Sequence, residues 1–405
     1  MTKKAHISGA DARGYGRLAV DATLGLTRLV ETLHHNILRR PGILGVATDA
    51  PTRGITGFVY KSIRGVTRVV GGGLDVVLAQ LAKLFEDAAP SPQREAVVAA
   101  LNGVFGDHLA ATGNPLAIPM RLRRDGQALT LTRGGLRQAI PHATGKVLVL
   151  AHGLCMNDLR WRRHGHDHGA ALAADAGYTP VYLHYNSGLH VAANGAEFAD
   201  RIEALLCAWP VPVEELTIIA HSAGGLVARS ACQHAAIARQ RWLRRLHTMV
   251  FLGTPHFGAP LERGGGWVDT LLGASPYTTA FARLGKLRSA GITDLRHGSV
   301  LDEHTRQAGG ATPGSARHTL ALPPHVRCYA IAASLAPKSA KLATRLLGDG
   351  LVPLPSALGQ HKDARRSLAI PADRLCIAYG TGHLDLLDRA AVYAQIRRWL
   401  VAAPD

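Results

Sequence analysis

From residue 146 onward, short continuous apolar runs alternate with longer segments in which apolar residues recur every three to four positions. Continuous runs of this length are typical of strands buried on both faces, and the wider spacing predicts helices. The predicted strands are 146–151, 180–185, 216–221, 247–253, 326–332 and 374–379. The predicted helices are 167–177, 194–208, 223–239, 337–347 and 388–401. Their alternation predicts an α/β fold in which helices cover both faces of a mostly parallel central sheet.

A hairpin precedes this alternation, and a long insertion interrupts it. Residues 120–131 predict a hairpin around Asp125-Gly126, which we expect to open the sheet. Between 255 and 324 the alternation stops in a glycine-rich, lid-like insertion with short predicted helices at 266–273 and 276–289. Its apolar side chains would either line an acyl-binding surface or form a small core of their own. They are Trp267, Leu271, Leu272, Tyr277 and Phe281.

Residues 1–114 show a different pattern, and we expect them to form a helical N-terminal extension ahead of an α/β domain at 115–405. Helical periodicity covers 15–38 and 93–111, with prolines between the segments. At 55–70, Lys61, Arg64 and Arg68 share one helical face and apolar residues occupy the other. This helix would either make peripheral contact with an anionic membrane or pack its apolar face on the α/β domain.

The chain has 46 Lys and Arg against 29 Asp and Glu, a formal net charge of +17. This excess of basic residues favours anionic surroundings such as anionic lipid. The alternative is that it reflects only a coding bias toward arginine and alanine. The basic residues are scattered, without zinc-finger spacing or interleaved aromatic residues, so we expect no nucleic-acid partner. Five cysteines without paired spacing and no signal-like apolar segment predict reduced thiols and a cytoplasmic location, with peripheral membrane attachment as an option.

The most informative segment is the apolar run at 216–221, which is followed by Ser222 and a predicted helix. A strand that turns sharply into a helix exposes a serine in a strained conformation, and this requires small residues two positions before and after it. Ala220 and Gly224 occupy those positions, with alanine where glycine is more usual. The alternative is that Ser222 only caps the helix.

A serine nucleophile needs a base, an acid that orients the base, and hydrogen-bond donors for the oxyanion. His152-Gly153 follows a predicted strand, so the backbone N–H groups of Leu154 and Ala223 are the candidate donors, and His152 itself is interpreted as structural. Asp349 lies between two glycines, and His383 follows the strand at 374–379. The order Ser222, Asp349, His383 predicts that the three side chains meet at the carboxyl edge of the sheet.

These motifs resemble the α/β-hydrolase superfamily, and within it the lipase and inositol-deacylase-like (PGAP1-like) branch. The resemblance covers about residues 118–401, and the segments that carry it are His152-Gly153-Leu154, 220–224, 252–260, 348–353 and Gly382-His383. It implies an α/β-hydrolase catalytic domain that cleaves a small-molecule or lipid ester through an acyl-enzyme, without a cofactor. An acyltransferase or thioesterase would use the same residues, and an inert membrane-associated binding protein would keep the fold.

Two further polar segments carry weaker hypotheses. A metal site is one interpretation of the alternating histidines His164, His166 and His168. The glycine and charged residues between them favour a solvated loop instead, so we expect no metal. Residues 185–188 would either line the pocket or form a plain turn after a strand.

Overall fold

The computed structural model describes residues 13, 14, 17, 92–259, 289–301, 320–340 and 348–401. Contacts within the chain divide it into two units, residues 1–94 with 109–117 and residues 95–108 with 118–405. In the first unit, the Asn114 side-chain amide donates to the Gly14 carbonyl (3.1 Å), and its oxygen accepts from the Leu116 N–H (2.9 Å). The second unit contains the sheet and all the predicted motifs.

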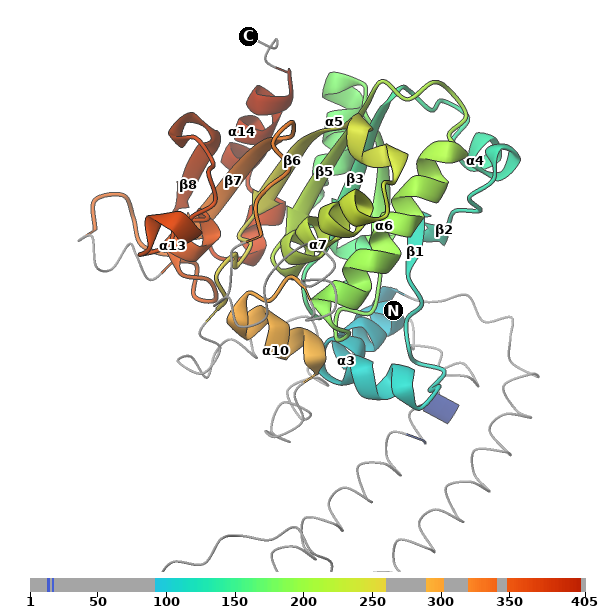
Figure 1. Cartoon of the computed structure of the whole chain (residues 1–405), viewed down its shortest axis with the longest axis horizontal. Coiled ribbons are helices and arrows are strands. Elements are labelled where there is room, and N and C mark those ends of the chain that lie inside the picture. The colour runs from blue at the N-terminus through green and yellow to red at the C-terminus, as the bar shows by residue number, and fades with distance from the viewer. Residues whose placement is uncertain are drawn as a thin grey trace, which may run out of the picture. The chain divides into compact units, whose positions relative to one another are not determined.

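In the described residues, eight strands form one sheet in the order β2-β1-β4-β3-β5-β6-β7-β8 (Figure 1). The strands are β1 Arg121–Arg124, β2 Gln127–Ala128, β3 Lys146–Ala151, β4 Thr179–His184, β5 Glu215–His221, β6 Leu246–Leu252, β7 Arg327–Ser334 and β8 Leu375–Tyr379. β1 pairs antiparallel with β2 and β4, and every other pairing is parallel. The predicted mostly parallel sheet is therefore confirmed.

Helices cover both faces of this sheet, as predicted. The described helices are α3 Pro92–Ala111, α4 Arg133–Ala139, α5 His168–Ala176, α6 Val191–Cys207, α7 Ala223–Ile237, α10 Ala290–His297, α13 Leu354–Ala357 and α14 Ala390–Val401. α6 and α7 lie side by side on one face, and α5 and α14 lie on the other (Figure 1). None of the described helices is both long enough and apolar enough to cross a membrane.

Successive side chains of the central strands pack alternately into two separate hydrophobic cores, one on each face of the sheet. In β3, Val147 and Val149 belong to the cluster that includes α6 and α7, whereas Leu148 and Leu150 belong to the cluster that includes α5 and α14. All four side chains are fully buried. A strand enclosed on both faces has no polar face, which explains the continuous apolar runs in the sequence.

The predicted hairpin is confirmed by its turn. Asp125 (φ 50°) and Gly126 (φ 75°) both adopt left-handed conformations between β1 and β2, as a two-residue hairpin turn requires. The predicted helix at 337–347 is wrong over its described part. β7 continues to Ser334, and the Ala340 N–H then donates to the Pro337 carbonyl in a turn.

Parts of the N-terminal extension and of the insertion lie outside the described residues. These parts include the predicted helices at 55–70 and 266–273, the one at 15–38 except for Arg17, and the one at 276–289 except for Ser289. Within the insertion, the sequence analysis missed α10. Its signals were present, because the Ser289 hydroxyl caps the first turn and Gly298 ends the helix in a left-handed conformation.

Candidate active site

Ser222 lies at the sharp turn between β5 and α7. Its backbone has φ 54° and ψ −126°, a strained conformation for a residue with a side chain. Its side chain makes no capping hydrogen bond to α7, so the alternative of a simple helix cap is wrong. A Cβ at Gly224 would lie 2.5 Å from the His152 carbonyl oxygen, which explains the small residue required there. The local geometry is that of the predicted nucleophile elbow.

Asp349 and His383 form a fully buried pair. The Asp349 Oδ2 lies 2.7 Å from His383 Nδ1, and Oδ1 accepts from the N–H groups of Leu351 (2.9 Å) and Val352 (2.8 Å). Because an ionised carboxylate only accepts, the hydrogen of the neutral imidazole is on Nδ1. The other nitrogen, Nε2, is buried and has no hydrogen-bond partner among the described residues. This nitrogen is therefore free to accept a proton.

The His383 ring lies next to the Ser222 elbow. Its centroid is 4.7 Å from the ring of His221, and a Cβ at Gly253 would lie 3.1 Å from its Cε1 and Nδ1. Gly253 follows Leu252, whose carbonyl accepts from the Ser222 N–H (2.8 Å). The structure thus brings the turn that carries Ser222 and the Asp349–His383 pair together at the carboxyl ends of the strands.

The loop after β3 packs directly against the elbow. A Cβ at Gly153 would lie 2.9 Å from the Ser222 Cβ, so only glycine allows this approach. Leu154 follows and is fully buried. Ala223 is the first residue of α7, where a backbone N–H has no acceptor within its own helix. The structure therefore places both predicted oxyanion donors in segments that border Ser222.

Residues 185–188 hold this loop in place. The Tyr185 hydroxyl donates to the His152 carbonyl (2.8 Å), and the Ser187 hydroxyl accepts from the Cys155 N–H (3.0 Å). The Asn186 amide donates to the Gly106 carbonyl of α3 (2.9 Å). The end of β4 thus supports the candidate oxyanion loop, a role that the sequence analysis did not assign to it.

Replacing Gly153 by alanine should move the loop away from Ser222, because the added Cβ would lie 2.9 Å from the serine Cβ. Loss of one oxyanion donor typically lowers kcat by about 10²- to 10³-fold, and we expect Gly153→Ala to approach this range in an ester hydrolysis assay. Gly134→Ala is the matched control, since a Cβ there meets nothing within 4 Å. Equal kcat values for the two variants would contradict the placement of the loop.

Four of the buried histidines outside the Asp349–His383 pair have lowered pKa values. Burial lowers the pKa of His152 to about 3 and that of His168 to about 4. Burial lowers the pKa values of His221 and His256 well below the usual range, and the nearby His383 and Arg229 respectively lower them further. The His152 ring stacks on Tyr185 at 4.4 Å, which agrees with the structural role predicted for it.

These four histidines should make the fold sensitive to acid. Their pKa values lie below the unfolded value of about 6.5, so the unfolded chain binds protons first as the pH falls. The stability from burying neutral rings is complete above about pH 6.5 and is lost as the pH falls toward 4. We expect the free energy of unfolding in urea, measured from about pH 7 to pH 5, to show that unfolding takes up protons. The uptake should approach one proton per histidine at about pH 5. The exposed-site variant His247→Gln should show the same slope, and a pH-independent free energy of unfolding would contradict this expectation.

The solvated loop that we predicted at 164–168 is correct for His164, which lies exposed in a turn, and wrong for His168. His168 is fully buried, its Nε2 donates to the Leu386 carbonyl (2.9 Å), and its Nδ1 lies 2.8 Å from His166 Nε2. His164 contacts Asp388. These ring nitrogens already have protein partners. The prediction failed for His168 because its partner comes from a segment 218 residues away.

A second polar cluster contains the ligand types of a metal site. Donor atoms of Glu95, Asp158 and His184 lie within 4.8 Å of one another. However, the Arg123 guanidinium already bonds Glu95 (2.8 Å) and Asp158 (2.9 Å), which supplies the positive charge that these carboxylates need. The arrangement is an ion-pair network, and it joins α3, β1, β4 and the turn Asp158–Trp161.

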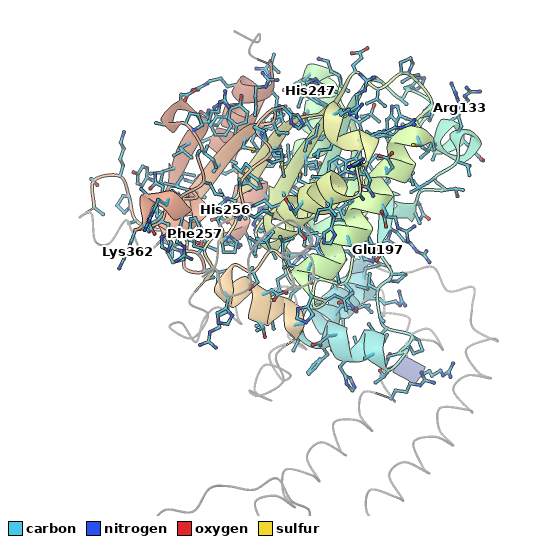
Figure 2. The ribbon with its side chains drawn as sticks, viewed as in Figure 1. Arg133, Glu197, His247, His256, Phe257 and Lys362 are labelled. Carbon is cyan, nitrogen blue, oxygen red and sulfur yellow. The ribbon has the colours of Figure 1, made fainter. Side chains whose placement is uncertain are left out.

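The segment after β6 packs against α7. His247 lies near the start of β6, and His256 lies beyond its end, on the side of the sheet where the strands have their carboxyl ends (Figure 2). Arg229 of α7 is buried, with Nη1 3.3 Å from His256 Nδ1 and Nη2 donating to the Leu320 carbonyl (2.7 Å). Its burial lowers the pKa of the guanidinium to about 10. Sequence analysis missed Arg229, because its position in the apolar helix gives no sign of these distant partners.

Of the remaining predictions, the one on the cysteines concerns described residues, and the one on the acyl-binding side chains does not. The five cysteines all lie in the described residues and are free thiols. The candidate acyl-binding side chains lie outside the described residues; they are Trp267, Leu271, Leu272, Tyr277 and Phe281.

Comparison with known families locates one matching domain. Residues 143–321 match the family model of the PGAP1-like alpha/beta domain. No curated protein matches the chain in sequence.

Solved structures of low identity also align with the chain. The mature form of the Bacillus licheniformis lipase BlEst2 is 14% identical, with a TM-score of 0.42, and the alignment covers 70% of this chain and 98% of that one. The Pyrococcus furiosus esterase Pf2001 is 11% identical, with a TM-score of 0.39 and coverage of 64% and 82%. An alpha/beta hydrolase superfamily protein from Enterococcus faecalis is 14% identical, with a TM-score of 0.37 and coverage of 63% and 89%. The order and direction of the strands, together with the match of residues 143–321 to that family model, show that this chain has an α/β-hydrolase fold and that this segment is similar to the PGAP1-like alpha/beta domain.

Proposed function

We propose that the chain is a serine hydrolase that cleaves carboxylic esters, with lipid-like acyl esters as its substrate class. The observation that carries this proposal is the buried Asp349–His383 pair, whose unpartnered Nε2 belongs to a ring beside the strained turn at Ser222. The lipid-like substrate class is supported by the resemblance of residues 252–260 to the corresponding segment of lipase-like enzymes.

In the first half of the reaction, Ser222 Oγ would attack the acyl carbonyl carbon while His383 Nε2 accepts the hydroxyl proton. Asp349 stabilises the imidazolium that forms and holds its Nδ1–H in place. The N–H groups of Leu154 and Ala223 would donate to the tetrahedral oxyanion, each contributing about 3–4 kcal/mol. The alcohol then leaves with the proton from Nε2, and the acyl group remains on Ser222.

In the second half, His383 would remove a proton from water as its oxygen attacks the acyl carbon. His383 then returns that proton to Ser222 Oγ as the bond to the acyl group breaks and the acid is released. The same acyl-enzyme would react with another alcohol or a thiol if water were excluded. Hydrolysis is proposed because nothing in the described site favours a particular acceptor over water.

A fluorophosphonate probe tests the nucleophile, and a series of acyl esters tests the substrate class. We expect the probe to label Ser222, as located by peptide mass spectrometry. Each added methylene contributes up to about 0.8 kcal/mol when buried, so kcat/KM should rise through acyl chains of about ten carbons for a lipid-like substrate. A maximum at two to four carbons would indicate a small-molecule esterase instead. Unlabelled Ser222 in folded protein would contradict the proposed chemistry.

A further inference from the structure

His221 lies one residue before Ser222 and contacts the loop that carries His383. Its Nε2 is 3.1 Å from the His383 carbonyl oxygen, and the two rings lie 4.7 Å apart at an angle of 49°. Because a carbonyl oxygen only accepts, Nε2 carries the hydrogen of the neutral His221 ring and donates it to His383. The contact therefore joins two segments separated by 162 residues.

The surroundings of His221 keep this donor in place. Its side chain is fully buried, and both burial and the neighbouring His383 lower its pKa well below the usual range, so the ring stays neutral. Its unprotonated Nδ1 lies beside Gly153, where a Cβ would approach within 3.1 Å. His221 thus touches the candidate oxyanion loop on one side and the His383 loop on the other, while its own backbone leads into Ser222.

We propose that His221 is a positioning residue whose Nε2–H bond to the His383 carbonyl sets the separation between the His383 imidazole and Ser222. This inference rests on the proposed function, in which His383 Nε2 exchanges a proton with Ser222 Oγ. The hydrogen bond between Nδ1 and Asp349 restrains the far side of the imidazole but does not involve the His383 backbone. The N–H groups of Thr381 and Gly382 are bonded to the Ser334 carbonyl and to Asp385, and the bond from His221 restrains the His383 carbonyl itself. A displacement of about 1 Å at a reacting group can cost about 10²-fold in rate.

A matched pair of substitutions separates the hydrogen bond from the space that the ring fills. His221→Gln keeps an N–H donor about as far from the backbone as Nε2, whereas His221→Met has similar length and no donor. We expect kcat of His221→Met to fall by about 10- to 100-fold with little change in KM, because ground-state binding does not use this contact. His221→Gln should recover kcat to within about threefold of wild type.

Two readouts exclude a general loss of folded protein. Rates are expressed per Ser222 labelled by the fluorophosphonate, so unfolded molecules do not contribute. The downfield proton resonance of the His383–Asp349 hydrogen bond reports the ring position directly, and we expect it to be retained in His221→Gln and to be shifted or broadened in His221→Met. Equal kcat in the two variants, together with an unchanged resonance in His221→Met, would overturn the assignment.

This design also separates the inference from the proposed function. If Ser222 were not labelled in wild-type protein, the proposed chemistry would fail, yet the resonance would still show whether His221 positions His383. If Ser222 were labelled and the two variants behaved alike by both readouts, the chemistry would stand and the positioning role would fail.

Discussion

Replacement of Ser222 by alanine should abolish almost all ester hydrolysis, with a fall in kcat of about 10⁶-fold. The serine is the only group at the elbow that would form a covalent bond to the acyl carbon, and its φ of 54° holds it at the turn beside His383. Steady-state hydrolysis of the preferred acyl ester measures the loss, and the fluorophosphonate should no longer label the protein.

Ser230→Ala is the matched control for this experiment. Ser230 lies two turns further along α7, is fully buried, and its hydroxyl has no partner among the described residues. Removing that hydroxyl leaves no partner unpaired, so we expect activity and labelling close to wild type. Activity of Ser222→Ala above about one hundredth of wild type would show that another group is the nucleophile.

Asp349→Asn should have the second largest effect, a fall in kcat of about 10⁴-fold with little change in KM. Two backbone N–H groups, from Leu351 and Val352, donate to Oδ1, so the oxygen of an asparagine amide would occupy that position. Its NH₂ group would then face His383 Nδ1. A donor at that point forces the hydrogen of the imidazole onto Nε2, the nitrogen that has to accept the proton from Ser222.

The control for Asp349→Asn is Asp363→Asn. Asp363 accepts the Arg365 N–H in a partly exposed turn, a bond that an asparagine oxygen also accepts. Kinetics of the two variants, with circular dichroism to verify folding, give the comparison. A loss below about tenfold for Asp349→Asn would mean that the carboxylate does not set the tautomer of His383.

The features that sequence analysis predicted well depend on local patterns. Strand β5 and the turn at Ser222 could be predicted because a buried parallel strand must be continuously apolar and the elbow needs Ala220 and Gly224 around the serine. The pairing of Asp349 with His383 followed from chain order, since loops after parallel strands share one edge of the sheet. Here spacing along the chain carried the information.

The features that were missed depend on contacts between distant segments. The His221 bond to His383 and the burial of His168 against Leu386 each join residues more than 150 positions apart. Arg123 lies in a short strand that reads simply as basic, although Glu95 and Asp158 enclose its guanidinium. A single sequence gives no signal for such partners, because arginine, aspartate and glutamate are mostly exposed and histidine often is, so residue type alone does not indicate a buried contact.

Arg229 reaches from the helix behind the elbow to His256 on one side and to Leu320 on the other. Those two positions flank most of the insertion, so a single guanidinium fixes both ends of a long stretch of chain. A change in the length of the intervening chain would therefore leave its two points of attachment in place, next to the helix that follows Ser222.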